Sequence, residues 1–408
     1  IKVKALPEGI ETNPNIPHMT FVNTVDGFAW LTLYLETVVS ALAWKPSTAA
    51  TIAKLYRRQA EEWVSKTDPS NMWLVDFMCH DFSARGLDPM SQYLIGLGHA
   101  TSFKGSDTLP VIPAARYFYG VREDEMPIFS VNASEHSVST TKIFTVGESQ
   151  MIADWLKIFP KGILSIVADT FDLWKLITEY LPANKKAIMS RDGKLVIRPN
   201  SGDPVDIICG DNYWRDSVQT LGKEVLNKPE AKGVIELLWD IFGGTINEQG
   251  YKVLDPHIGA IYGDSITPER QLQIYERLAA KGFAATNIVL GIGSYTYQYN
   301  TRDTLGFAAK GAWFEVQNEK CGHIVNNHKG DCICKKSYNI YKDPVTDDGT
   351  KKSLKGLLQV LGDRNMKNIT VHTEQDWEQE SKGLLQLIYE DGKFYNQTTL
   401  EEIRKRLK

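Results

Sequence analysis

Residues 194–206, Lys-Leu-Val-Ile-Arg-Pro-Asn-Ser-Gly-Asp-Pro-Val-Asp, place polar side chains directly after a short apolar run. The polar residues that follow the run are Arg198, Asn200, Ser201 and Asp203. Pro199 cannot donate a ladder hydrogen bond and Gly202 permits a turn, so we expect a buried strand that ends here. A fixed guanidinium beside hydroxyl and amide groups suits a ligand that carries phosphate and sugar hydroxyls. An ordinary strand followed by a proline turn is the alternative for this cluster alone.

The same pattern recurs three times along the chain. Apolar runs over 161–168, 257–262 and 287–290 each end in polar or glycine residues. Those residues are Asp169, Gly263 with Asp264, and Gly291 with Gly293 and Ser294. The intervals contain helical patterns, one of which begins at Thr267 as N-cap with Pro268 in the first helical position. Alternating strands and helices predict a parallel sheet, in which ligands bind at the carboxyl ends of the strands.

We therefore predict an α/β fold with a TIM-like (β/α) barrel over 69–304; closure of that barrel with eight strands stays open. The flanks differ in character. They predict strands over 1–6, 335–342 and 383–389, helices over 30–44 and 47–64 separated by Pro46, and a helix over 400–407. We expect the segments 1–68 and 305–408 to build a second, β-rich domain together. The chain begins at Ile1 without methionine, and we expect that an upstream segment precedes it.

Composition excludes several classes of protein. Lys and Arg number 46 and Asp and Glu 50, a net charge of −4, so the chain offers no basic field for nucleic acid. No apolar stretch approaches the ~18–20 residues of a membrane helix, so no membrane partner is expected. Five cysteines in 408 residues argue against a disulfide framework, and we expect a reducing compartment, the cytoplasm.

Several motifs together resemble the nicotinamide phosphoribosyltransferases, which are type II phosphoribosyltransferases. In chain order the motifs are Asp81–Gly86, Phe103–Thr108, Ala133–Ser137, Lys194–Pro204 and Tyr341–Val345. Their order and spacing are similar to those of the family from one end of the chain to the other. The resemblance implies an enzyme that uses 5-phosphoribosyl 1-pyrophosphate and nicotinamide to make nicotinamide mononucleotide and pyrophosphate. It also implies a homodimer with two active sites at the subunit interface.

The resemblance places two residues beside the pyridine ring. Phe82 would stack on the ring, although on sequence alone it could be a core aromatic residue. Asp107 would face the carboxamide, although it could also be a turn aspartate before Pro110. A carboxylate accepts a hydrogen bond from an amide but repels nicotinate, so Asp107 favours the amide substrate.

Further residues match positions that hold phosphate and ribose in the family. They are Arg85, Arg198 and Ser201, Gly263 with Asp264 at the ribose hydroxyls, Gly293 and Ser294 at the 5-phosphate, Arg302 and Lys310 from the neighbouring subunit, and Lys342 at the anion site. Asn200 stands where the family commonly has aspartate, so the negative charge is lost there while hydrogen bonding is kept. With Arg198, Asn200 belongs to the expected catalytic residues.

The two other expected catalytic residues are His136 and Asp169. By resemblance, ATP phosphorylates His136 and thereby favours product formation, while Asp169 orients the imidazole and fixes its tautomer. A satisfied structural histidine is the alternative. We expect ATP to be a facultative co-substrate and Mg²⁺ to enter on the pyrophosphate oxygens, with no dedicated protein metal site.

Other functions and one other site remain open. A nicotinate phosphoribosyltransferase and a non-catalytic ligand-binding homologue are alternatives. An aldolase or a glycosidase is disfavoured, because the sequence shows no identifiable Schiff-base lysine and no acid/base pair. Cysteines and histidines gather at Cys321, His323, His328, Cys332 and Cys334. Their spacing favours an extended surface hairpin over a zinc site, because it is not that of paired Cys-x-x-Cys motifs.

Overall fold

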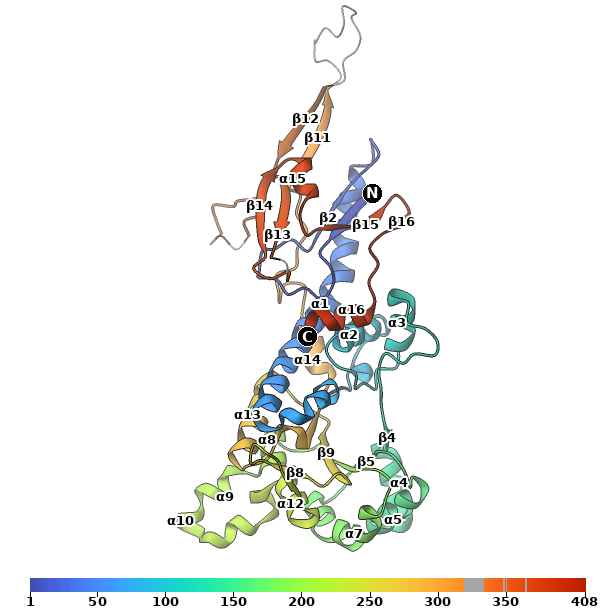
Figure 1. The fold of residues 1–408 in the computed structure, drawn as a ribbon, viewed down its shortest axis with the longest axis vertical. Helices are drawn as coiled ribbons and strands as arrows, with labels where there is room; N and C mark the ends of the chain where they lie inside the picture. Colours follow the sequence, from blue (N-terminus) through green and yellow to red (C-terminus); the bar gives the residue numbers. More distant parts are fainter. Residues whose placement is uncertain (319–333, 348, 350, 364) are drawn as a thin grey trace, which may run out of the picture. The chain divides into compact units, whose positions relative to one another are not determined.

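The computed structural model describes residues 1–318, 334–347, 349, 351–363 and 365–408 (Figure 1). The chain divides into two compact units, one over 45–300 and one formed by 1–44 with 301–408. The domain boundaries predicted from the sequence, 69–304 and 1–68 with 305–408, remain a prediction. Within the described ranges, no helix has the length and apolarity that crossing a membrane requires.

A six-stranded parallel sheet organises the unit 45–300. Its strands in spatial order are β3 (Cys79–Asp81), β10 (Ile288–Ile292), β9 (Ile258–Tyr262), β6 (Leu195–Arg198), β5 (Leu164–Val167) and β4 (Asn132–Ala133). Every neighbouring pair is parallel. The strands predicted at the four recurring motifs are confirmed, and β6 coincides with the apolar run before Pro199.

Isolated bridges continue the pairing beyond β3. Asp81 pairs with Ser106, and Gly105 pairs with Phe129, both in parallel. Phe129 lies three residues before β4, which pairs with β5. The predicted α/β class is thus confirmed as a mixed α/β fold around a curved parallel sheet.

Helices connect and cover these strands, as expected for βα units. They are α2 (Pro89–Ala100), α3 (Val111–Tyr119), α4 (His136–Val146), α5 (Glu148–Ile158), α6 (Leu173–Lys175), α7 (Leu181–Met189), α8 (Pro204–Cys209), α9 (Asn212–Asp216), α10 (Val218–Leu221), α11 (Pro229–Lys232), α12 (Val234–Phe242), α13 (Pro268–Ala280) and α14 (Ser294–Gln298). A short hairpin, β7 (Gly244–Ile246) with β8 (Lys252–Leu254), follows α12. Thr267 caps α13 by accepting a hydrogen bond from the Arg270 amide, as predicted.

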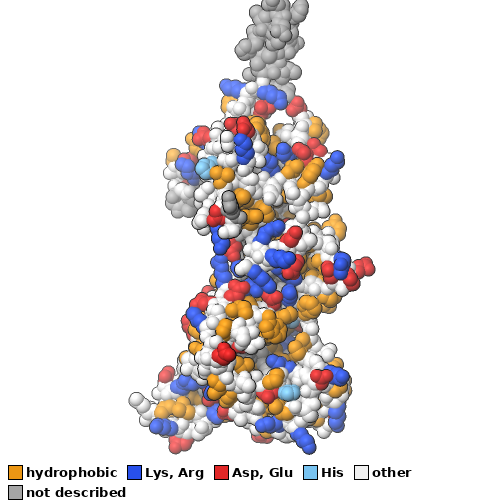
Figure 2. Space-filling view, in the orientation of Figure 1, with side chains coloured by type: hydrophobic (Ala, Val, Ile, Leu, Met, Phe, Trp, Pro, Cys, Tyr) orange, Lys and Arg blue, Asp and Glu red, His pale blue; other side chains and the backbone are white. Residues whose placement is uncertain are grey.

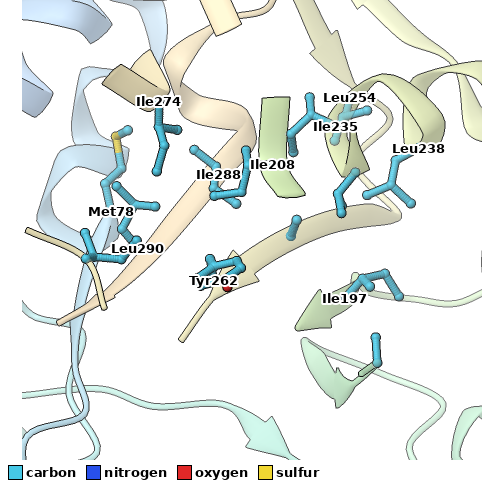
Figure 3. Packing of buried hydrophobic residues seen from close by; sticks show 14 of the residues in the cluster. Met78, Ile197, Ile208, Ile235, Leu238, Leu254, Tyr262, Ile274, Ile288 and Leu290 are labelled. Atoms are coloured by element: carbon cyan, nitrogen blue, oxygen red, sulfur yellow. The ribbon is translucent and has the colours of Figure 1, made fainter. Parts of the chain in front are cut away.

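The core of this unit lies between the sheet and its helices (Figure 3). All five residues of β9, Ile-Gly-Ala-Ile-Tyr, are buried, as is typical of a parallel strand covered on both faces. Side chains of α8, α12 and α13 pack against β9 and β10; Ile208, Ile235, Leu238 and Ile274 come from the helices, and Ile288 and Leu290 from β10. This packing fixes the strands whose ends carry the polar residues.

The unit formed by 1–44 and 301–408 is built from small antiparallel sheets. Its strands are β1 (Lys2–Ala5), β2 (Met19–Val22), β11 (Trp313–Asn318), β12 (Cys334–Asn339), β13 (Leu357–Leu361), β14 (Thr370–Gln375), β15 (Gln386–Glu390) and β16 (Lys393–Phe394). One sheet has the order β16-β15-β1-β2, and β11–β12 and β13–β14 form pairs. Helices α15 (Trp377–Ser381) and α16 (Leu400–Leu407) complete the C-terminal part.

Two helices predicted on either side of Pro46 are one helix in the structure, which corrects that expectation. Helix α1 runs from Trp30 to Thr67 with Pro46 inside it. Proline removes the hydrogen bond to the carbonyl of Leu42. Leu42 lies on an exposed stretch, where water can replace that bond.

On the face seen in Figure 2, acidic and basic side chains intermingle and form no single field of either sign.

Candidate active site

The residues predicted at the strand ends lie at one edge of the parallel sheet. Phe82 follows β3, Asp169 lies two residues after β5, Arg198 ends β6, Gly263 follows β9 and Gly293 follows β10. Because parallel strands present their carboxyl ends at the same edge, these residues converge there.

Phe82 and Arg198 form an aromatic and cationic wall. The Phe82 amide donates to the carbonyl of Ile292 (2.9 Å), which extends the β3–β10 pairing by one residue. The guanidinium carbon of Arg198 lies 5.0 Å from the centre of the Phe82 ring, within the range of a cation–π contact. A Cβ at Gly291 would lie 2.6 Å from Cε2 of Phe82 and 2.9 Å from Cα of Gly263, so only glycine lets the ring lie there.

Asp107 is held by groups from two neighbouring segments. Its amide donates to the carbonyl of Asp81 (2.9 Å), and its Oδ1 lies 3.0 Å from Nε2 of His80. The Ser130 hydroxyl donates to the same oxygen. Burial alone would raise the pKa of Asp107, but these hydrogen bonds and the charge of Arg198 outweigh it and hold that pKa below its usual value.

Hydrogen bonds to Asp169 shape the turn after β6. Oδ2 of Asp169 accepts hydrogen bonds from the backbone amide of Asn200 (3.2 Å) and from the Ser201 hydroxyl (2.5 Å). Gly202 has a φ of +91°, as the predicted turn requires. The buried Tyr262 hydroxyl donates to the carbonyl of Gly202 (2.9 Å), which ties this turn to the end of β9.

The turn leads directly into α8. The Asp203 carboxylate caps this helix by accepting from its first amides, and it also lies 3.5 Å from Arg270 of α13. The neighbouring loop after β9 carries the exposed Asp264, whose carboxylate accepts from the Ser265 hydroxyl (3.0 Å). The left-handed φ of Ser265, +56°, marks a tight turn at that loop.

Several buried polar atoms at this edge have no hydrogen-bond partner within the part of the chain that the structure describes. They are Oδ1 of Asp169, Oγ1 of Thr170, Nε of Arg198 and Oδ1 of Asn200. Buried polar groups are nearly always satisfied, because an unpaired one costs roughly 1–3 kcal/mol. At the ends of β5 and β6, a polar ligand would supply partners for these four atoms.

His136 is the first residue of α4, and its Nε2 lies 3.5 Å from Oδ1 of Asp169. The histidine side chain is 39% exposed, whereas that of Asp169 is 7% exposed. Ser134 anchors the segment before the helix, because its buried hydroxyl accepts from the Val167 amide of β5 (3.0 Å). His136 is thus accessible from solvent while a buried carboxylate lies behind it.

The remaining residues of this edge come from the loops after β3 and β10. Gly293 precedes α14, and Ser294 is the first residue of that helix. A Cβ at Gly86 would overlap the Ser294 hydroxyl, so the loop with the exposed Arg85 packs directly against the start of α14. The structure thus brings Arg85 and Ser294 into adjoining segments.

Three predicted residues belong to the other unit, and their relation to this site stays a prediction. Arg302 pairs with the carboxylate of the next residue (2.8 Å), and Lys310 lies 3.8 Å from Glu36. The Lys342 amide donates to the Ser353 hydroxyl (2.8 Å). The cysteine and histidine cluster at 321–332 lies outside the described residues.

Four residues of this edge were missed by sequence reasoning: His80, Ser130, Thr170 and Tyr262. One signal could have found His80, because residues two apart on a strand share a face and Phe82 was already expected at the ring. Their ring centres lie 4.8 Å apart. Ser130 carries no comparable signal, since only the bridge between Gly105 and Phe129 brings it near Asp107.

The described residues hold no group of three or more His, Cys, Asp or Glu side chains placed to bind a metal ion. Carboxylate, guanidinium and amide groups at the ends of parallel strands instead define an α/β enzyme site for a polar, anionic ligand. Residues 77–381 match the nicotinate phosphoribosyltransferase (NAPRTase) family. The chain belongs to this family of enzymes.

The similar proteins match between 83% and 100% of this chain. A nicotinamide phosphoribosyltransferase of Acinetobacter baylyi is 41% identical over 415 residues, which covers 100% of this chain and 76% of that protein. The protein of the same name in Mycoplasma pneumoniae is 34% identical and covers 83% of this chain and 67% of its own length. The crystal structure of nicotinate-nucleotide pyrophosphorylase from Pyrococcus furiosus aligns over 100% of this chain and 79% of that chain, with a TM-score of 0.53. At 15% identity this last similarity concerns the fold alone.

Proposed function

We propose that this protein transfers the 5-phosphoribosyl group from 5-phosphoribosyl 1-pyrophosphate to nicotinamide, releasing pyrophosphate and forming nicotinamide mononucleotide for NAD salvage. The full-length similarity to a nicotinamide phosphoribosyltransferase carries this proposal. The unpartnered polar atoms of Asp169, Arg198 and Asn200 support it, because a phosphorylated sugar would supply partners for them.

Geometry also supports an amide-selective ring site. His80 contacts both Phe82 and Asp107, so the flat aromatic face and the ionised carboxylate lie on two sides of one imidazole. Phe82 would stack on the pyridine ring, and Asp107 would accept a hydrogen bond from the carboxamide. A nicotinate carboxylate would meet the negative charge of Asp107 instead.

The reaction breaks the bond between the anomeric carbon and pyrophosphate while the ring nitrogen attacks that carbon. Positive charge develops on the ribose as the bond weakens, so catalysis consists of positioning plus electrostatic stabilisation. In this proposal Arg198 and Arg85 hold the phosphates, Asn200, Ser201, Gly263 and Asp264 hold the ribose, and Gly293 with Ser294 receives the 5-phosphate. Arg302 and Lys310 of the neighbouring subunit would be basic partners of the 5-phosphate, and Lys342 is a further basic candidate for the anion site.

Coupling to ATP is a further part of the proposal. The partly exposed His136 imidazole would accept the γ-phosphoryl group from ATP through Nδ1, with ADP leaving, while Asp169, which faces Nε2, would stabilise the charged imidazole. Mg²⁺ would enter bound to the pyrophosphate and ATP oxygens, in keeping with the hard oxygen ligands it prefers.

Architecture and assembly complete the proposal. The bridges from Asp81 through Gly105 to Phe129 support a TIM-like barrel in the unit 45–300. The strand-rich unit of both flanks would be its second domain. We also propose a homodimer with shared active sites, working in the cytoplasm.

A synthesis assay tests the proposed function. The purified protein is incubated with 5-phosphoribosyl 1-pyrophosphate and Mg²⁺, with either nicotinamide or nicotinate, and with or without ATP, and the mononucleotide is quantified by chromatography. We expect nicotinamide to be the preferred substrate and ATP to raise the yield. Preference for nicotinate would overturn the proposal, and formation of neither product would favour a ligand-binding homologue. The variant Asp107→Asn separates ring selectivity from turnover.

A further inference from the structure

His80 touches both residues assigned to the pyridine ring, although the proposed reaction gives it no task. Its ring centre lies 4.8 Å from that of Phe82, and its Nε2 lies 3.0 Å from Oδ1 of Asp107. The His80 side chain is 12% exposed, whereas that of Asp107 is 41% exposed. The imidazole therefore lies behind the carboxylate, which itself remains accessible to a ligand.

Both side-chain hydrogen bonds to Asp107 end on the same oxygen. An ionised carboxylate only accepts hydrogen bonds, so Nε2 of His80 must carry the hydrogen. The Ser130 hydroxyl is the second donor to Oδ1. Oδ2 has no hydrogen-bond partner among the described residues, so the carboxylate is held through one oxygen and presents the other.

The backbone fixes both sides of this arrangement. The Asp107 amide donates to Asp81, the residue after His80, so the two segments cannot slide past each other. A Cβ at Gly105 would lie 2.9 Å from Nδ1 of His80, which shows how closely the chain passes behind the imidazole. The His80 ring is thus confined between Gly105 and Phe82.

We propose that His80 and Ser130 are positioning residues that set the preference for a carboxamide over a carboxylate by holding Asp107 ionised, with Oδ2 turned to the ligand. This inference rests on the proposed function and names what makes its ring site selective. Without the two donors, Asp107 could rotate or take up a proton. A protonated Asp107 donates a hydrogen bond and would then accept nicotinate.

The charges that face Asp107 agree with this role. Arg198 is the cation whose field acts on it, in addition to His80. The buried Asp81 carboxylate is engaged elsewhere, by the Ser83 amide (2.9 Å) and the Ser106 hydroxyl (3.4 Å). Although burial would raise it, the pKa of Asp107 is lowered, so removal of a donor should move the acid limb of the pH profile upward.

Paired substitutions test the inference. His80→Leu and Ser130→Ala remove one donor each, whereas His80→Gln keeps an amide donor and Ser130→Thr keeps the hydroxyl. kcat and KM are measured for nicotinamide and nicotinate, from acid to neutral pH, at saturating 5-phosphoribosyl 1-pyrophosphate. Ser130 is exposed, so Ser130→Ala keeps the test decisive if His80→Leu does not fold.

Loss of either donor should raise KM for nicotinamide about tenfold and change kcat little. The contact that is weakened, from the charged Asp107 to the carboxamide, is made in the ground state and the transition state alike. The kcat/KM ratio of nicotinamide to nicotinate should fall about tenfold, and the acid limb should move to higher pH. His80→Gln and Ser130→Thr should stay within about threefold of the parent protein.

Two results would overturn the inference in distinguishable ways. An unchanged substrate ratio in both His80→Leu and Ser130→Ala, with an active parent protein, would refute the positioning role and leave the proposed function standing. Equal losses in His80→Leu and His80→Gln would do the same, because they would indicate a purely structural imidazole. Absence of nicotinamide turnover by the parent protein would refute the proposed function first, and this inference with it.

Discussion

Replacing Gly291 by alanine should displace the aromatic wall of the site. The added Cβ would lie 2.6 Å from Cε2 of Phe82 and 2.9 Å from Cα of Gly263. Non-bonded carbon atoms pack at about 3.5–4.0 Å, so the Phe82 ring must move by about 1 Å. Arg198, whose guanidinium carbon lies 5.0 Å from the ring centre, would lose its cation–π contact with Phe82 as well.

The size of the effect follows from this displacement. A misplacement of about 1 Å at a positioning group can lower the rate about a hundredfold, and we expect kcat/KM of Gly291→Ala to fall by that order. Over-packing a filled site costs about 1–3 kcal/mol, which should appear as a lower free energy of unfolding. Both effects come from the collisions of the added Cβ with the Phe82 ring and with the Gly263 backbone.

The assay compares synthesis kinetics and urea unfolding for Gly291→Ala, Phe82→Leu and the double variant. Leucine lacks the ring edge, so in the double variant the alanine should cost less than it does in the parent protein, with only the contact to the Gly263 backbone remaining. Gly311→Ala is the matched control, since its Cβ would meet its nearest neighbour, Ile340, at an ordinary 3.4 Å. Unchanged activity and stability of Gly291→Ala, or full additivity with Phe82→Leu, would refute the reasoning.

Three further predictions concern the same unit. Ser134→Ala should lower the free energy of unfolding by about 1–3 kcal/mol in urea titrations, because the buried Val167 amide loses its acceptor; Ser134→Thr should lose less. Burial lowers the pKa of His99, so on acidification below about pH 6.5 the unfolded chain takes up the proton before the folded chain does. Stability should therefore fall on acidification by up to about 1.4 kcal/mol per pH unit, and His99→Leu should remove that contribution from unfolding curves at several pH values. Arg198→Lys should lower kcat/KM roughly tenfold or more without unfolding the protein, since an ammonium cannot stack on Phe82 as a planar guanidinium does; an unchanged value would exclude that stacking role.

The sequence predicted the strand ends of the sheet well, for a physical reason. Buried parallel strands have continuous apolar runs, and the polar or glycine residues after them are conspicuous. Arg198, Asp169 and Gly263 were found in this way, as was the Thr267 cap of α13. Helix α1 was divided wrongly, because a proline was taken as a break although one lost hydrogen bond is tolerable on an exposed stretch.

Contacts between segments could not be predicted in the same way. The hydrogen bond from Ser130 to Asp107 depends on which segments the bridges between β3 and β4 bring together. The hydroxyl of Tyr262 reaches Gly202 only because β9 and β6 are neighbours in the sheet. Periodicity identifies the strands, but their order in space sets these partners.

The pairing of β3 with β10 has a consequence for how the chain is made. β3 ends at residue 81, and its partner β10 begins about two hundred residues later, at residue 288. At ~5–20 residues per second, the ribosome needs roughly 10 to 40 s to deliver that partner. During this interval the apolar Cys79 and the unsatisfied edge of β3 have no β10 to cover them. The nascent chain should therefore be a chaperone client, and a ring site that needs Phe82 beside Gly291 can form only after β10 has left the ribosome.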